Sequence, residues 1–270
     1  MKKVGIAGII LGAVLWSQLY SQTQRQYIWK AELQRFEQQP SVERSAPNIT
    51  EVSEPFLTVL QPQKSNTNRP AVLVFPGGGY RQIVIQKEGY AIAQWLNDQG
   101  ITACILAYRL RRDSALMDAQ RAMRFIRYHS AAWNIDPQRI GVMGFSAGGH
   151  LALNVATHAH SSLLCEPLDS VGCKPNFMVL VYGVFNQLAT LVDKGTPPAF
   201  LAHASDDDKA PVSQSVDLYT TLRNTGVPAE MHIYERGGHG FALLEGRGAV
   251  TGWAKSCIEW MKERGILADH

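Results

Sequence analysis

The chain of 270 residues is long enough to bury a sizeable core, and we expect one large domain. Hydrophobic residues make up 46% of it and charged residues 18%, which is ordinary for a globular protein. The formal net charge of +3 at pH 7 is small and dispersed along the chain, so the sequence argues against nucleic acid as a partner.

The first residues have the layout of an export signal. Two lysines follow Met1, an apolar run extends from Val4 to Trp16, and a polar segment comes next. The run is too short to be a comfortable transmembrane helix. We therefore expect residues 1–21 to be a signal peptide or, alternatively, an uncleaved anchor that attaches the protein to a membrane. In either case the protein is expected to be exported, to the periplasm or the medium.

The cysteines fit an oxidising compartment, which an exported chain enters. Cys165 and Cys173 flank a short loop, and we predict a disulfide between them. Cys104 lies in a predicted strand and Cys257 in a predicted helix, and both are interpreted as small buried hydrophobic residues.

The remaining chain predicts a linker and then alternating strands and helices. Residues 22–50 are rich in Gln, Glu, Arg and Ser and are interpreted as a linker, and residues 51–270 as the folded domain. In chain order we predict strands at 56–60 and 71–75, a helix at 88–99, a strand at 101–108, a helix at 117–132, a strand at 139–145, a helix from 147, strands at 177–182 and 199–204, a helix at 212–224, a strand at 229–234 and a helix at 251–264. Continuous apolar strands spaced by amphipathic helices predict a mostly parallel sheet with helices on both faces.

One of these strands runs into a serine between two glycines. The strand ends at Phe145, Ser146 follows, and a helix begins at Ala147, with Gly144 and Gly148 two residues on either side of the serine. A sharp turn from strand to helix crowds the backbone, so both flanking positions must be very small. The bend would expose the Ser146 hydroxyl, as a nucleophile requires, and would place it beside the free N–H groups at the N-terminus of the helix.

A serine hydroxyl needs a base, and the base needs an acid to orient it. Of the eight histidines, only His239 lies in a loop with glycines on both sides, after the last predicted strand. His158 and His160 lie two residues apart and point to different faces of a helix, so they do not indicate a metal site. For the acid, the loop between the serine and the histidine offers Asp206, Asp207 and Asp208, and the pattern does not choose among them.

Three glycines follow the strand at 71–75, in the stretch from Phe75 to Tyr80. Small residues there leave backbone N–H groups open to an anion, and together with the Ala147 N–H they would form an oxyanion hole. Alone, this glycine run would be a weak signal, because it could be only a flexible turn.

Taken together, the motifs resemble one branch of a known family. The glycine run, the segments 118–127 and 133–152, the three-aspartate loop and the stretch 226–241 are similar to the acetyl-xylan and feruloyl esterases of the α/β-hydrolases, near the hormone-sensitive-lipase-like esterases. The resemblance covers roughly residues 55–265 and implies an α/β-hydrolase fold with a mostly parallel eight-stranded sheet and no large lid. Pro76 stands where related esterases have His, a difference common in this branch.

The resemblance also implies roles for particular residues. It matches the nucleophile to Ser146, the base to His239, and the oxyanion donors to Gly78, Gly79 and Ala147. Counting four residues back from Pro211 matches the acid to Asp207, with Asp206 as the alternative.

The expected activity is hydrolysis of short-chain acyl esters through an acyl-enzyme, with no metal or organic cofactor. The expected substrates are small-molecule or carbohydrate esters, acetyl or feruloyl in type. Two alternatives remain: a serine exopeptidase of the same fold, which would need a site for a peptide amine, and a ligand-binding protein of this fold without activity.

Overall fold

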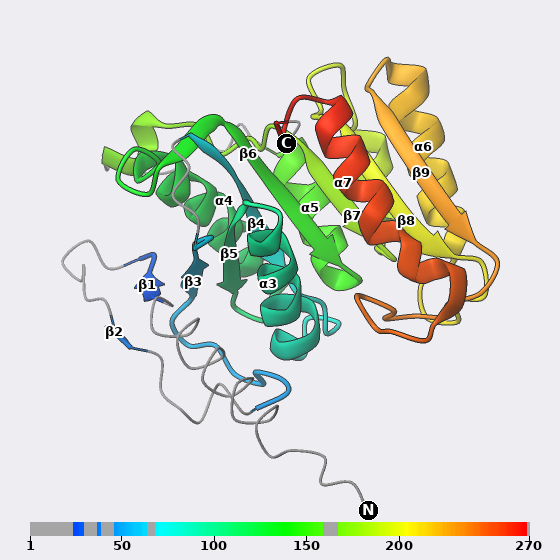
Figure 1. The fold of residues 1–270 in the computed structure, drawn as a ribbon, viewed down its shortest axis with the longest axis horizontal. Coiled ribbons are helices and arrows are strands. Elements are labelled where there is room, and N and C mark those ends of the chain that lie inside the picture. The colour runs from blue at the N-terminus through cyan, green and yellow to red at the C-terminus, as the bar shows by residue number, and fades with distance from the viewer. Residues whose placement is uncertain (1–23, 30–36, 39–45, 64–67, 159–166, 269–270) are drawn as a thin grey trace, which may run out of the picture.

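The computed structural model describes residues 24–29, 37–38, 46–63, 68–158 and 167–268. In this part of the chain, nine strands form one sheet in the order β2-β1-β3-β5-β4-β6-β7-β8-β9 (Figure 1). The strands are β1 (Gln24–Tyr27), β2 (Glu37–Gln38), β3 (Phe56–Leu60), β4 (Arg69–Phe75), β5 (Thr102–Ala107), β6 (Ile135–Phe145), β7 (Met178–Val181), β8 (Ala199–Ala204) and β9 (Ala229–Tyr234).

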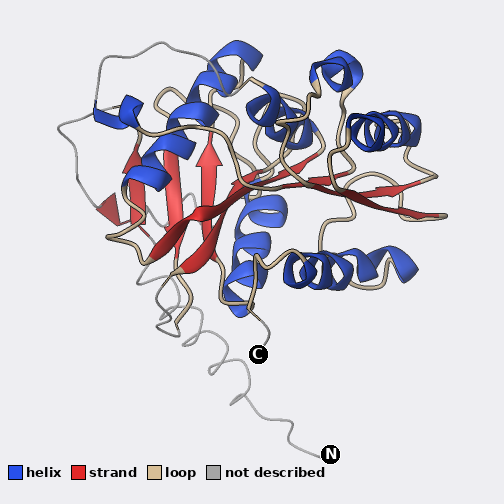
Figure 2. Ribbon diagram, turned by 90° about the horizontal axis from the view of Figure 1, so that it is seen from above, coloured by secondary structure: helices blue, strands red, loops and turns tan. Residues whose placement is uncertain are grey.

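Helices cover both faces of the sheet, as Figure 2 shows from above. In Figure 1, α3 and α7 lie on the near face and α4, α5 and α6 on the far one. Their bounds are α3 (Ala91–Asp98), α4 (Arg112–Tyr128), α5 (Ala147–Thr157), α6 (Val212–Thr225) and α7 (Trp253–Glu263). A short π-helix at Gln86–Tyr90 leads into α3, and short 3₁₀-helices lie at Pro167–Ser170, Asn186–Leu191 and Gly248–Gly252.

Every pairing from β5 across to β9 is parallel, whereas β1, β2 and β3 pair antiparallel. The expected fold class, a mostly parallel sheet between two layers of helices, is confirmed. All seven strands predicted from the sequence are present, and the segment 22–50, interpreted as a linker, adds β1 and β2 at the edge of the sheet, so the described residues form nine strands where the resemblance implied eight. The polar composition of β1 does not predict a strand, yet its four residues pair with β3 in register, and the side chains of Arg25 and Tyr27 contact the Phe56 ring of β3.

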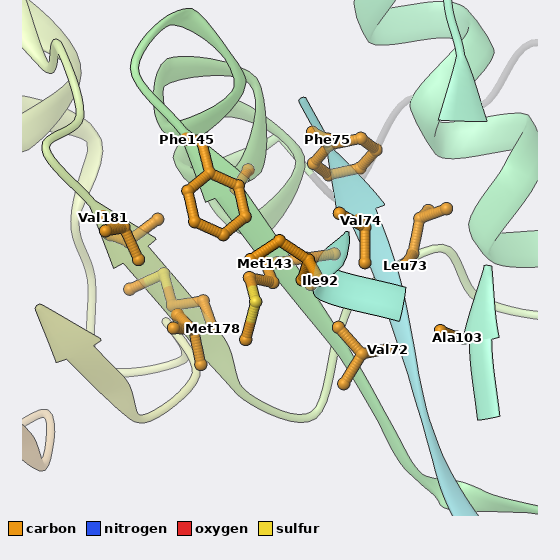
Figure 3. Close-up of a cluster of buried hydrophobic side chains, with 14 of the residues drawn as sticks. Val72, Leu73, Val74, Phe75, Ile92, Ala103, Met143, Phe145, Met178 and Val181 are labelled. Carbon is orange, nitrogen blue, oxygen red and sulfur yellow. The ribbon is translucent and has the colours of Figure 1, made fainter. Parts of the chain in front are cut away.

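The core lies between the central strands and the helices. β4 is buried along its whole length, and so are β5, β7 and β8. Figure 3 shows side chains from β4 and β6 meeting in this core, among them Val72, Val74, Phe75, Met143 and Phe145. Parallel strands with helices on both faces have no solvent face, which is why their sequences are continuously apolar.

Strand bounds agree with the sequence better than helix bounds do. β3, β8 and β9 begin and end where predicted, but α4 starts at Arg112 and ends at Tyr128, not at 117 and 132. Its first turn is polar, with Asp113 near the N-terminus, so the apolar periodicity did not reveal it.

Cys104 and Cys257 are fully buried, as expected. Cys165 lies outside the described residues, so its disulfide with Cys173 stays a prediction, as does the signal segment 1–21. Among the described helices, none is long and apolar enough to cross a membrane.

Candidate active site

Ser146 occupies the bend between β6 and α5. Its φ of 52° and ψ of −118° lie in a region that non-glycine residues rarely adopt. A Cβ on Gly148 would lie 1.9 Å from the carbonyl oxygen of Phe75, and one on Gly144 would lie 2.1 Å from that of Gly148. No side chain fits in either place, because both obstacles are backbone atoms. The close approach of α5 to β4 and β6 therefore holds the serine in its strained conformation.

His239 reaches Ser146 from the loop after β9. Its Nε2 lies 2.8 Å from Ser146 Oγ and its Nδ1 lies 2.8 Å from Asp207 Oδ2. Gly238 and Gly240 have φ values of 62° and 73°, so the glycines on both sides permit the tight loop. In this arrangement Nδ1–H donates to the carboxylate, and Nε2 is left to accept the serine hydroxyl proton.

Asp207 is buried and surrounded by donors. Its Oδ1 accepts hydrogen bonds from the backbone N–H groups of Lys209 and Ala210, both at 2.9 Å, while Oδ2 faces His239. Burial raises the pKa of this carboxyl, but the hydrogen bonds from Ala210, His239 and Lys209 together outweigh burial and lower the pKa below its usual value. Asp207 is therefore ionised at neutral pH.

A second histidine, His203 at the end of β8, lies against the same carboxylate. Its Nε2 is 3.2 Å from Asp207 Oδ2 and 2.9 Å from the Ala210 carbonyl oxygen, and its Nδ1 is 2.7 Å from Ser215 Oγ. The side chain is fully buried, and burial lowers the pKa of His203 despite its acceptors. A neutral ring with the proton on Nε2 satisfies all three contacts, since the Ser215 hydroxyl then donates to Nδ1.

Asp206 and Asp208, the other two acids of the loop, do different things. Asp206 Oδ1 accepts hydrogen bonds from Gly237 N–H at 2.9 Å and Gly238 N–H at 2.7 Å, just before the histidine. Asp208 is exposed and pairs with Lys209 at 3.0 Å. The structure therefore brings Asp207, and neither neighbour, to the imidazole.

The glycine loop after β4 lies beside the serine. Gly78, Gly79 and Ala147 line the same cleft as Ser146 and His239. Among the described residues, none accepts a hydrogen bond from the N–H groups of these three. Gly78 and Gly79 have φ values of 129° and 66°, which a side chain would oppose. The three predicted oxyanion donors are thus together and unoccupied by protein acceptors.

Glu88 holds the glycine loop by a hydrogen bond from the loop's backbone, and nothing in the sequence indicated this role beyond an acid at the start of a predicted helix. The side chain is only 4% exposed, with Oε2 accepting the Gly77 N–H at 2.7 Å and Oε1 accepting the Tyr182 hydroxyl at 3.0 Å. Burial raises the pKa of Glu88, against the lowering by these hydrogen bonds. The Tyr182 ring in turn contacts that of His239 edge to face, with centroids 5.1 Å apart. One buried carboxyl therefore connects the oxyanion loop to the histidine.

The cleft in front of these groups has a volume of about 740 Å³, a size common for small-ligand sites. Its wall includes Tyr80, whose hydroxyl lies 2.9 Å from Nδ1 of His150 on α5. Both residues lie within the motifs described above, at the end of the glycine run and after the serine bend, but the sequence assigned neither a role in the site.

Comparisons with known proteins agree with this geometry. The BD-FAE family model matches residues 57–186, and the model of the prolyl oligopeptidase family matches residues 181–264. The solved acetyl ester-xyloside bifunctional hydrolase from Caldicellulosiruptor lactoaceticus is 35% identical, with a TM-score of 0.77, and the match covers 90% of this chain and 97% of that one. This chain belongs to the α/β-hydrolase esterases.

The curated relatives that this chain matches are longer proteins. An acetylxylan esterase of Xylanibacter ruminicola is 32% identical over 66% of this chain and 42% of its own length. An endo-1,4-beta-xylanase B of Butyrivibrio fibrisolvens is 26% identical over 70% of this chain and 35% of its own. This chain therefore spans less than half the length of these two relatives.

Proposed function

We propose that this esterase is a serine carboxylesterase that removes short acyl groups, acetyl or feruloyl, from carbohydrates. The observation that carries the proposal is the unbroken chain of hydrogen bonds from Ser146 through His239 to Asp207, each at 2.8 Å, beside three unoccupied N–H groups. That combination serves acyl transfer.

In the first half-reaction, His239 Nε2 takes the Ser146 proton as Oγ attacks the ester carbonyl carbon. Asp207 keeps the imidazole in the tautomer that can accept at Nε2 and stabilises its positive charge. The carbonyl oxygen becomes an oxyanion, which the N–H groups of Gly78, Gly79 and Ala147 bind. His239 then gives its proton to the leaving alcohol oxygen, which departs as the acyl-enzyme forms.

In the second half-reaction, water attacks the acyl-enzyme with His239 again as base. The tetrahedral intermediate collapses, the acid leaves, and the proton returns to Ser146 Oγ. The roles of Glu88 and Asp206 in this scheme are positional, because they hold the oxyanion loop and the histidine loop.

The substrate class draws support from the relatives. The names of the similar proteins describe activity on acetyl ester and xyloside, or on acetylxylan. The cleft, of about 740 Å³, has room for a small acyl group and the sugar that carries it. Among the described elements, none forms a large lid over it.

The test is hydrolysis of 4-nitrophenyl acetate, 4-nitrophenyl butyrate and acetylated xylo-oligosaccharides by the wild type and by Ser146→Ala. We expect turnover by the wild type and a loss of several powers of ten in the variant, with the same melting temperature. Equal rates in both proteins would contradict the proposal, and covalent labelling of Ser146 by a fluorophosphonate is the independent check.

A second candidate is a serine peptidase, because the prolyl oligopeptidase family model covers the segment with the predicted acid and base. Such an enzyme would need a carboxylate to hold a peptide amine, and no Asp or Glu is among the described residues lining the cleft. Aminoacyl 4-nitroanilides separate the two: turnover of these faster than of 4-nitrophenyl acetate would favour the peptidase.

We also propose that the esterase is exported, on the basis of the lysine pair and the apolar run from Val4 to Trp16. Expression of the full chain with a periplasmic marker, followed by mass measurement of the mature N-terminus, tests both export and cleavage near residue 21.

A further inference from the structure

The cleft wall carries charges of one sign. Arg81, Arg112 and Lys209 line it together with Ser146 and His239, and no Asp or Glu is among the described lining residues. The proposed chemistry needs only the catalytic groups and the N–H donors, so the ester reaction itself does not explain three cationic side chains around its entrance.

Of the three cations, only Lys209 has a counter-ion among the described residues. Lys209 forms an ion pair with Asp208, and the two side chains are 68% and 72% exposed. In the described part of the chain, Arg81 and Arg112 form neither an ion pair nor a side-chain hydrogen bond. Their guanidinium groups are therefore available to a ligand in the cleft.

The charge of Arg112 acts inside the cleft as well as at its rim. Its guanidinium lies over the Tyr80 ring, 5.7 Å from the centroid, and Tyr80 bonds to His150. Burial, with the nearby Arg112 as a second cause, lowers the pKa of His150 to about 4. The imidazole is thus neutral at physiological pH, and the cleft's positive potential comes from the arginines and Lys209.

A guanidinium offers two parallel N–H donors that match a carboxylate, and it stays charged at every relevant pH. A cleft with one sign of charge also concentrates ligands of the opposite sign and raises their association rate. Neutral sugar hydroxyls would also accept hydrogen bonds from the same arginines, but they have neither the opposite charge nor the two oxygens that match a guanidinium.

We infer that the natural substrate is an acyl ester of a carboxylate-bearing carbohydrate, a uronate, whose carboxylate binds to Arg81 and Arg112 while the ester lies at Ser146. This inference rests on the proposed esterase function and names its substrate class. The reaction is unchanged: the ester C–O bond is hydrolysed by water, and the uronate carboxylate takes no part in it.

The test compares two monoacetylated sugars that differ only in the group at C6. The full-length esterase is assayed for acetate release from a monoacetylated methyl glucuronoside and from the corresponding methyl glucoside, at 20 mM and 500 mM NaCl. At low salt we expect kcat/KM for the glucuronoside to be at least tenfold higher, through a lower KM. At 500 mM salt this preference should shrink several-fold, because exposed charges are screened.

Variants locate the effect. Arg81→Gln and Arg112→Gln should each reduce the glucuronoside-to-glucoside ratio of kcat/KM at least threefold, and the double variant should bring it near one. Arg112→Lys should keep part of the ratio. Arg223→Gln is the matched control, because it removes the same charge at the far end of α6, a helix that leads away from the Asp207 loop.

Equal kcat/KM for the two sugars in the wild type would overturn the inference, and so would a ratio that Arg223→Gln lowers as much as Arg112→Gln. In either case, continued hydrolysis of 4-nitrophenyl acetate by the wild type leaves the esterase proposal standing. If the folded wild type hydrolyses neither sugar nor 4-nitrophenyl acetate, the esterase proposal itself fails, and the inference fails with it.

Discussion

Asp206 and Asp207 are adjacent in the chain and hold different parts of the site. Asp207 is buried with Oδ2 on His239, while Asp206 is exposed and binds the backbone of Gly237 and Gly238. Asp206 lies in a turn that the Asp207 N–H closes by donating to the Ala204 carbonyl oxygen at 3.3 Å, and the two carboxylates leave this turn toward different partners, so they cannot exchange roles without rebuilding the loop. The choice between them, open from the sequence pattern, thus has a geometric answer.

Replacing Asp207 by Asn should lower kcat for 4-nitrophenyl acetate by about three to four powers of ten, because the amide favours the wrong imidazole tautomer. Asp206→Asn keeps an oxygen for the two glycine N–H groups, so its kcat should fall less than tenfold. Steady-state kinetics of both variants measures the difference. A larger loss in the Asp206 variant would mean that the acid is wrongly assigned.

Glu88 should affect the site through hydrogen bonds. Glu88→Ala leaves the Gly77 N–H and the Tyr182 hydroxyl buried without their acceptor, at a cost of about 1–3 kcal/mol each, and frees the oxyanion loop. We expect kcat for 4-nitrophenyl acetate to fall ten- to a hundredfold with little change in KM. Glu88→Gln keeps an acceptor for Gly77 and should retain most of the rate.

The measurement is kcat for 4-nitrophenyl acetate of the two Glu88 variants between pH 5 and 9, with melting temperatures as the folding control. Equal losses in both variants would show that the carboxylate charge matters and not the hydrogen bonds.

At the scale of elements, the conformation of Ser146 depends on how closely α5 approaches the sheet. The helix begins at Ala147 directly after β6, and Gly148 packs against the Phe75 carbonyl of β4. The same contact shapes the start of the oxyanion loop, since Phe75 ends β4 and Pro76 follows. The packing of α5 on β4 and β6 thus positions Ser146 together with the N–H group of Ala147 and the start of the glycine loop.

Gly148→Ala should therefore disrupt both stability and activity. Its new Cβ would lie 1.9 Å from a backbone oxygen, so α5 must move, and we expect a loss of at least 2–3 kcal/mol in the free energy of unfolding. Gly252→Ala is the control, because a Cβ there meets nothing within 4 Å. Urea unfolding and 4-nitrophenyl acetate turnover should be nearly normal in the control. An active, stable Gly148→Ala protein would contradict this packing argument.

At the scale of the molecule, four loops meet at one edge of the sheet. The glycine loop follows β4, Ser146 follows β6, Asp207 follows β8 and His239 follows β9. These strands run parallel, so their carboxyl ends lie at the same edge, where open α/β sheets bind ligands. Residues almost a hundred positions apart in the chain are thereby brought within hydrogen-bond distance.

The folded molecule should lose stability in mild acid, and His150 should contribute to the loss. Its pKa is about 4 when folded, against an ordinary value near 6.5, because of burial and then Arg112. The contribution of His150 to the free energy of unfolding is complete above about pH 6.5 and is lost as the pH falls toward 4, since between these values only the unfolded chain takes up the proton. The contribution is at most about 1.4 kcal/mol per pH unit.

Urea unfolding at pH 7, 6 and 5 tests this in the wild type and in His150→Gln, whose amide can still bond to Tyr80. The free energy of unfolding should fall less steeply with pH in the variant. Parallel curves for the two proteins would show that His150 does not contribute.

The sequence by itself determined the fold class and the order of strands and helices, and it singled out Ser146, His239 and the glycine loop as candidates for the site. These are properties of local patterns: apolar strands buried on both faces are continuously apolar, and the bend at Ser146 tolerates only glycine at 144 and 148. Patterns of this kind are visible in a single chain.

Only the tertiary structure decided which aspartate meets His239, that Glu88 and His203 are buried beside the site, and that part of segment 22–50 pairs with the sheet. Each depends on contacts between segments far apart in the chain, such as the 94 positions between Glu88 and Tyr182. A carboxylate on a buried turn and one on a solvated turn have the same local sequence signature. The packing of the other elements around them sets their environment, and that packing has no local pattern.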